Sequence, residues 1–194
     1  MLAIFLDSET NGLNYRKHKI IDIAFKILNL KSGKLIFDYQ SIIFQPLKIW
    51  EKSDPTSLKI NGFNWEMVKE GKPQKKVSKE IKRVFFEVGI NKKNSLFICQ
   101  NPSFDRAFFA QIISPEEQER LSWPYHWLDL ASMYWSLAIK SKNYPWNESL
   151  SKDAIAEKYN LPREVKPHRA MGGVEHLITC YETIVGFPEK NVPI

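Results

Sequence analysis

The sequence has few cysteines and no recognisable leader segment, which narrows the class of protein. Only two cysteines, Cys99 and Cys180, occur among the 194 residues, and both lie in apolar stretches without regular spacing. This excludes a disulfide framework and predicts reduced, buried thiols. The apolar start at residues 1–6 lacks a basic leader and runs into Asp7 and Glu9. We therefore expect no signal peptide, no membrane span and a cytoplasmic protein.

Nothing in the sequence marks a domain boundary, because no internal repeat and no low-complexity linker occurs. The length and the 43% hydrophobic content predict a single domain over residues 1–194 with one sizeable core. The formal net charge is +6 and the sequence pI is about 9.2. This excess of positive charge favours contact with a polyanion, although ordinary solubility charge explains it equally well.

Hydrophobic patterning predicts an antiparallel meander followed by alternating strands and helices. The predicted strands are residues 2–7, 19–30, 34–45 and 95–99, with a turn at 31–34. The predicted helices are residues 54–69, 75–88, 104–113, 127–139, 152–159 and 170–185. This order predicts an α/β fold in which helices cover a mixed sheet.

Two carboxylates, Asp7 and Glu9, end the first predicted strand. Alternate residues of a strand share a face, so both project to the same side. Such a pair repels itself at neutral pH unless a cation lies between, and hard oxygen ligands suit Mg²⁺ or Mn²⁺. An arbitrary Asp-x-Glu is more often a solvated strand end. Here the apolar strand favours a metal site, as does the following turn, whose Gly12 permits close approach of the backbone to a ligand.

Two further candidate residues begin predicted helices. Asp105 shares a helix face with Phe108, Phe109 and Ile112, so its side chain is expected to point inward. The alternative is a carboxylate that only stabilises the helix macrodipole. His168 lies where a loop marked by prolines enters the last helix. A helix N-terminus holds an imidazole toward the neutral form that a general base needs, although a lone loop histidine is more often structural.

Taken in order, these groups resemble the DEDD exonuclease superfamily, in the histidine-bearing DEDDh subfamily that includes exonuclease X, RNase T and the epsilon proofreading subunit of DNA polymerase III. The resemblance spans residues 5–185. Its motifs are Asp7-Ser8-Glu9-Thr10, Asn101-Pro102-Ser103-Phe104-Asp105 and His168-Arg169-Ala170. It implies an RNase H-like fold, with a mixed five-stranded sheet whose first three strands are antiparallel and whose faces are flanked by helices.

The resemblance implies a metal-dependent 3′-to-5′ exonuclease that releases nucleoside 5′-monophosphates from single-stranded ends, of DNA rather than RNA. Asp7, Glu9 and Asp105 would hold two Mg²⁺ or Mn²⁺ ions, and His168 would take the proton of the attacking water, so that His168, Glu9 and Asp7 form the catalytic set. The residues expected to contact nucleic acid are Thr10, Asn11, Gly12, Leu13, Asn101, Phe104 and Arg169. Leu13 could equally belong to the core and Arg169 to the ordinary surface. Relatives occur as dimers and as polymerase subunits, so a homodimer stays open.

One position departs from the family pattern, which has an aspartate five residues after the histidine where this sequence has Gly173. Helical spacing turns position 173 inward, whereas Glu175 lies about 200° further round and faces away. Three explanations are open: an introduced inactivating substitution, a natural loss, or a ligand from elsewhere such as water or substrate phosphate. We favour the first, because Gly172 and Gly173 each cost the helix roughly 0.5 to 1 kcal/mol relative to alanine.

Gly173 also keeps two rival functions open. With one ligand missing, one ion is expected to be weak or absent, and activity to be far below that of a Gly173→Asp version. The first rival is an exonuclease fold that has lost catalysis and binds nucleic acid ends or another protein. The second is a different phosphoesterase on the same RNase H-like fold.

Overall fold

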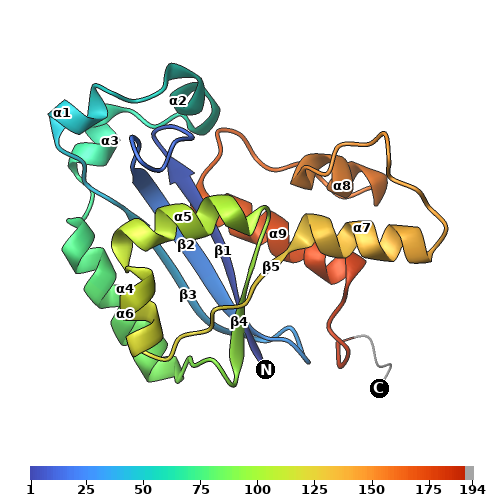
Figure 1. Ribbon diagram of the computed structural model, residues 1–194. Coiled ribbons are helices and arrows are strands. Elements are labelled where there is room, and N and C mark those ends of the chain that lie inside the picture. Colours follow the sequence, from blue (N-terminus) through green and yellow to red (C-terminus); the bar gives the residue numbers. More distant parts are fainter. Residues whose placement is uncertain (191–194) are drawn as a thin grey trace.

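A computed structural model of the chain describes residues 1–190 and shows a five-stranded mixed sheet (Figure 1). The strands are β1 (Leu2–Thr10), β2 (Ile20–Asn29), β3 (Leu35–Ile42), β4 (Ser95–Cys99) and β5 (Trp127–Asp129), in the order β3-β2-β1-β4-β5. Strand β2 pairs antiparallel with both β1 and β3, whereas β4 pairs parallel with β1 and β5. The predicted α/β fold, with its antiparallel first three strands, is confirmed.

The helices follow the predicted pattern with local differences. They are α1 (Leu47–Trp50), α2 (Pro55–Asn61), α3 (Trp65–Lys69), α4 (Gln74–Val88), α5 (Pro102–Ile112), α6 (Pro115–Arg120), α7 (Leu130–Lys140), α8 (Lys152–Lys158) and α9 (Ala170–Ile184). The single helix predicted at 54–69 is split, because Gly62 ends α2 in a left-handed conformation and the Asn64 side chain caps α3. Helices α1 and α6 were not predicted.

The helix predicted at 127–139 begins three residues later than expected. Residues 127–129 instead form β5, which pairs with β4. The Asp129 carboxylate accepts hydrogen bonds from the backbone N–H groups of Ala131 and Ser132, so that α7 starts only at Leu130. Apolar spacing alone did not reveal this strand, because strand pairing and a cap, not periodicity, set the boundary.

Helices cover both faces of the sheet. Buried side chains of α4 and α5, among them Phe85 and Phe108, pack with Leu6 and Phe25 in the core on one face. On the other face, α9 packs on Phe5 and its strand neighbours. Both cysteines are buried free thiols, as predicted. None of the helices within residues 1–190 is long and apolar enough to cross a membrane.

The C-terminal end of β1 emerges at the centre of the sheet. Strand β4 pairs with β1 only from Leu2 to Phe5, whereas β2 follows β1 as far as Thr10. The last residues of β1 therefore have no strand partner on the β4 side. The N-terminus of α5 lies next to this gap, because α5 directly follows β4. Crevices at the carboxyl ends of such strands are the usual ligand sites of α/β sheets.

Candidate active site

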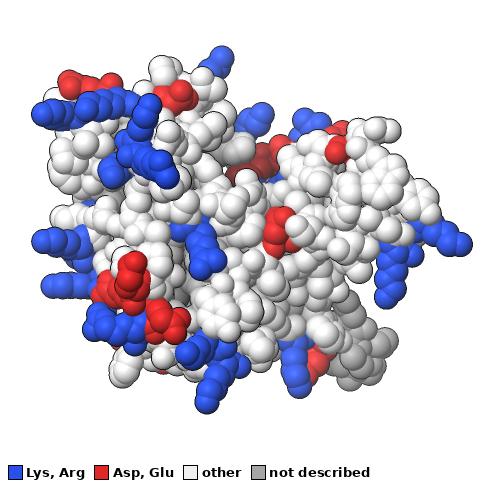
Figure 2. Space-filling model, in the orientation of Figure 1, with Lys and Arg blue, Asp and Glu red and all other residues white. Residues whose placement is uncertain are grey.

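A pocket of about 320 Å³ opens at the end of β1 and collects residues from distant parts of the chain. Its lining residues are Asp7, Ser8, Glu9, Gln100, Phe104, Asp105, Ser151, Lys152, Asp153, Glu164 and His168. Figure 2 shows carboxylate atoms recessed in a hollow between the α2 and α5 region and α8, with lysine and arginine side chains around the outer surface. The predicted Asp7, Glu9, Asp105 and His168 thus meet in one cavity.

Asp7 and Glu9 are held without enough positive charge to balance them. Burial raises the pKa of Asp7, an effect that Glu164 adds to and Lys152 opposes. Burial, with repulsion from Asp7 and Glu164, raises the pKa of Glu9 to about 8. Both carboxylates therefore hold protons more tightly than exposed ones do. A cation placed among them would remove this cost.

Asp105 enters the pocket from the first turn of α5. Its side chain is buried, as predicted, and its Oδ1 accepts a hydrogen bond of 2.7 Å from Ser8 Oγ. Burial and the charge of Asp7 raise the pKa of Asp105 well above its usual value. The turn before α5 is fixed by Asn101, which has a left-handed backbone (φ 59°) and donates its N–H to Asp129 Oδ1 at 3.0 Å.

The loop that carries His168 is attached to the C-terminus of α2. The N–H of His168 donates to Ile60 O at 3.3 Å, and the guanidinium of Arg169 donates to Asn61 O and lies 4.2 Å from the centre of the Phe63 ring. These contacts hold the backbone segment that carries His168. The predicted phosphate contact of Arg169 remains a prediction.

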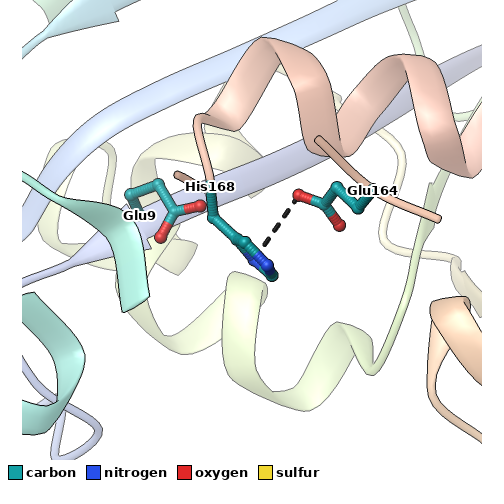
Figure 3. A group of neighbouring side chains, drawn as sticks. All are labelled: Glu9, Glu164 and His168. Carbon is teal, nitrogen blue, oxygen red and sulfur yellow. Dashed lines mark ion pairs between the residues drawn. The ribbon is translucent and has the colours of Figure 1, made fainter. Parts of the chain in front are cut away.

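The sequence interpretation missed Glu164, which lies close to His168 (Figure 3). Ligand atoms of Glu9, Glu164 and His168 all lie within 4.8 Å of one another, and His168 Nδ1 is 3.6 Å from Glu164 Oε1. Burial alone would raise the pKa of Glu164, but the neighbouring His176 and Lys152 lower it to about 2. Its only signal in the sequence was a glutamate four residues before the histidine, in a loop whose path periodicity does not predict.

Lys152, also missed, brings a positive charge into the same pocket. Its Nζ lies 3.0 Å from Asp7 Oδ1, 3.1 Å from Glu164 Oε2 and 3.2 Å from the carbonyl oxygen of Gly173. Burial disfavours the charged amine, but Asp7 and Glu164 outweigh burial and raise the pKa of Lys152. In the sequence, a lysine that begins a helix looks the same as a solvated surface lysine.

Gly173 is buried on α9 and faces Asp7, in line with the predicted inward position, and Glu175 points away to pair with Lys26. A Cβ at position 173 would overlap Asp7 Oδ2 and lie 2.6 Å from Asp7 Cγ. The carboxylate of Asp7 therefore occupies the space that a side chain at position 173 would need.

The residues of the turn after β1 that were predicted to contact substrate differ in their exposure to solvent. Leu13 is 76% exposed and so does not belong to the core. Thr10 and Asn11 are buried: the Thr10 hydroxyl donates to Gly12 O, and the Asn11 amide bonds to Ser53 and to the Lys19 N–H. A Cβ on Gly12 would overlap the His18 ring. In this structure the glycine makes room for a histidine, not for the ligand that its sequence context suggested.

The donor set fits a divalent cation. Besides the carboxylates of Asp7 and Glu9, the buried Oε1 of Glu164 has no hydrogen-bond partner within the described part of the chain. A buried, ionised oxygen without a partner is costly unless something binds it. Oxygen donors of this kind suit Mg²⁺ or Mn²⁺.

The fold and the acidic pocket together define a nuclease of the RNase H-like superfamily. The family model described as exonuclease, of the RNase T type, matches residues 4–181, so the chain belongs to this family and is a DEDD-type exonuclease.

Similar proteins agree with this assignment. The chain is 26% identical over 168 residues to DNA polymerase III of the PolC type from Thermotoga petrophila. The aligned region covers 87% of this chain but only 11% of that polymerase. Exonuclease I from Methylocaldum szegediense matches 94% of the chain and 40% of its own length, with a TM-score of 0.75 and 16% identity. Cell-death related nuclease 4 matches 97% and 65%, with a TM-score of 0.75 and 12% identity. These structures show the shared fold.

Proposed function

We propose that this protein is a metal-dependent 3′-to-5′ exonuclease that releases nucleoside 5′-monophosphates from single-stranded ends, with DNA as the preferred substrate. The observation that carries the proposal is the meeting of Asp7, Glu9, Asp105 and His168 in one pocket. These residues come from β1, from α5 and from the loop before α9, so only the folded chain brings them together. A divalent ion bound there supplies charge for the scissile phosphate and activation of water.

His168 is the residue that takes the proton. Its Nδ1 faces the ionised Glu164 at 3.6 Å, which favours a proton on Nδ1 and leaves Nε2 to accept one from water. Because backbone contacts hold the loop and Glu164 lies beside the imidazole, His168 lines the pocket before substrate binds. Glu9 provides ligand oxygens, and Asp7 and Asp105 place two further carboxylates in the same pocket.

The terminal base has a separate place beside the pocket. A smaller cavity of about 100 Å³ lies next to the site, between Leu13 and Phe104. An exposed leucine and a half-buried aromatic ring give a base an apolar surface that does not depend on its identity. Exonuclease I of E. coli, which shares this fold with a TM-score of 0.71, has been solved with a dT13 oligonucleotide. This likeness supports a single-stranded DNA substrate.

The test is a length analysis of single strands labelled at the 5′ end. Incubation with Mn²⁺ or Mg²⁺ is expected to give a ladder that shortens from the 3′ end and to release mononucleotides. Internal cuts, or shortening from the 5′ end, would contradict the proposal. The rates of shortening of a DNA strand and an RNA strand with the same sequence, measured side by side, decide which sugar is preferred.

A second candidate function follows from Gly173 and Lys152. An exonuclease fold without the fourth carboxylate could bind nucleic acid ends without cutting them. Tight binding with no release of mononucleotides at any Mn²⁺ concentration would favour this candidate.

A further inference from the structure

Lys152 lies beside Gly173, the position at which the family pattern has a carboxylate, and contacts both the Gly173 carbonyl oxygen and Asp7. An ammonium group has three N–H donors, and Asp7, Glu164 and the carbonyl oxygen of Gly173 give Lys152 an acceptor for each. Its side chain is 12% exposed. A lysine bound in this way is a fixed part of the site, not a mobile surface charge. The same glycine that lacks a side chain provides one of the three acceptors.

Glu164 supplies an acidic group that the family pattern does not predict at this place. Its side chain is 4% exposed, and its Oε2 lies 3.1 Å from Lys152 Nζ, while its Oε1 has no hydrogen-bond partner among the described residues and lies 3.6 Å from His168 Nδ1. The backbone N–H of Glu164 donates to Asp153 Oδ1 at 2.9 Å, which fixes the loop. Glu164 forms a cluster with Glu9 and His168, and one potential ligand atom of each residue lies within 4.8 Å of the other two (Figure 3).

We propose that Lys152 and Glu164 together replace the missing fourth carboxylate, so that the site holds one divalent cation between Glu9 and Glu164 while the ammonium of Lys152 balances Asp7. The inference rests on the proposed function for the kind of ion. Counted by themselves, Asp7, Glu9 and Glu164 with Lys152 leave two negative charges, which one Mg²⁺ or Mn²⁺ neutralises. Asp105 stands outside this count, because its carboxylate lies on the α5 side and accepts the hydrogen bond from Ser8. His168 lies beside the ion and remains free to take a proton.

Gly173 fits this arrangement and does not disturb it. A side chain at position 173 would overlap the Asp7 carboxylate that Lys152 holds. Gly173 and Lys152 therefore act together: the glycine leaves space for the Asp7 carboxylate, and the lysine balances its charge. This favours a natural replacement of the fourth ligand over an isolated inactivating substitution, which was the preferred explanation from the sequence.

Counting bound Mn²⁺ tests the inference without any substrate. Equilibrium titration of the purified chain, with free Mn²⁺ read by its electron paramagnetic resonance signal, is expected to give one bound ion per chain. Glu164→Gln is expected to weaken this binding at least about tenfold. Lys152→Met is expected to open a second binding step, because Asp7 loses its cation.

Two nearby residues provide matched controls. Glu157→Gln and Lys158→Met change the same residue types on α8, but Glu157 pairs with Arg163 and Lys158 with Glu148, outside the pocket. Both controls are expected to bind one ion with unchanged affinity. Thermal melts of all variants show that each is folded before its ions are counted.

The possible results separate this inference from the proposed function. Two ions on the unaltered chain, or wild-type affinity in folded Glu164→Gln, would overturn the inference. If Lys152→Met does not fold, the count on the unaltered chain and on Glu164→Gln still decides. One bound ion without release of mononucleotides would contradict the proposed function but support the inferred ion site. Two bound ions with release of mononucleotides would contradict the inferred ion site but support the proposed function.

Discussion

The two walls of the pocket balance their acidic groups in different ways. On the wall formed by β1 and α5, Asp105 is paired with the neutral hydroxyl of Ser8. On the side that faces α8 and α9, Asp7 of β1 is paired with the ammonium of Lys152, and the lack of a side chain at Gly173 leaves space for the Asp7 carboxylate. The first wall has the acidic residues that the family resemblance implies, and in the proposed arrangement the second has a lysine in place of a carboxylate. The difference shows that a family motif can be intact on one side of a site and rebuilt on the other.

The largest expected effect comes from His168, which lies between the two walls. His168→Ala is expected to lower the rate of mononucleotide release by a factor of about 10² to 10⁴, because the proton acceptor is lost. Mn²⁺ affinity should change by less than about threefold, since the ion is held by Glu9 and Glu164. Single-turnover release and Mn²⁺ titration measure the two quantities. The exposed His126 provides a control, and a rate in His168→Ala equal to that of His126→Ala would remove His168 from the mechanism.

Gly173→Asp tests the rebuilt wall directly. The new side chain must displace Asp7, so the free energy of unfolding is expected to fall by about 1 to 3 kcal/mol in urea denaturation. Lys152→Met in the same chain removes the cation that balances Asp7, so in chelator the double variant should lose further stability. Saturating Mn²⁺ should recover at least about 1 kcal/mol of this loss, because the added carboxylate and the freed Asp7 can then bind an ion. The double variant should also release mononucleotides faster than Gly173→Asp alone.

Gly172→Asp is the matched control for this experiment, because a Cβ at position 172 meets no atom within 4 Å. It introduces the same residue one position earlier in α9 and is expected to leave stability nearly unchanged. Equal stability of the two aspartate variants would show that position 173 is not crowded, and the exchange of carboxylate for lysine would lose its structural basis.

A smaller effect is expected at the exposed edge of the site. Leu13→Ala is expected to raise KM for a single strand about threefold to tenfold with little change in kcat, because an apolar contact with the terminal base is lost. Steady-state kinetics on a short oligonucleotide measure both constants. Leu47→Ala, at another exposed leucine, is the control. A fall in kcat with unchanged KM would assign Leu13 a role in chemistry instead of binding.

The smallest effect is a dependence of stability on pH in the metal-free protein. Burial and repulsion from Asp7 raise the pKa of Glu9 from 4.5 to about 8. Between these values the folded chain binds more protons than the unfolded chain, so stability falls as pH rises from about 4.5 to 8. Tm should therefore fall over this pH range, by roughly 2–4 °C for each kcal/mol of stability lost, and saturating Mn²⁺ should remove the difference.

Glu9→Gln separates this contribution from those of other groups. The variant cannot ionise at position 9, so its Tm in chelator should decline less between pH 5 and pH 8 than that of the unaltered chain. An identical fall in Tm in the two proteins would show that ionisation of Glu9 does not cause the loss of stability.

The sequence predicted the fold and one wall of the site, for physical reasons. Strand alternation and helical spacing are local, and they placed Asp7, Glu9 and Asp105 correctly. The remaining residues depend on tertiary contacts. Lys152 looks like any lysine at a helix start until α8 packs beside α9, and Glu164 lies in a loop whose path no periodicity sets. The split of α2 from α3 and the short β5 were likewise decided by caps and strand pairing.

A positive charge carried by a side chain, unlike a bound metal ion, cannot dissociate from the protein. The ammonium of Lys152 stays at Asp7 whether free magnesium is scarce or abundant, and a chelator cannot remove it. With only one exchangeable ion, the rate should rise with the first power of magnesium concentration, where two exchangeable ions would give a steeper, sigmoidal response. The exchange at positions 152 and 173 would therefore make this nuclease less sensitive to the supply of metal.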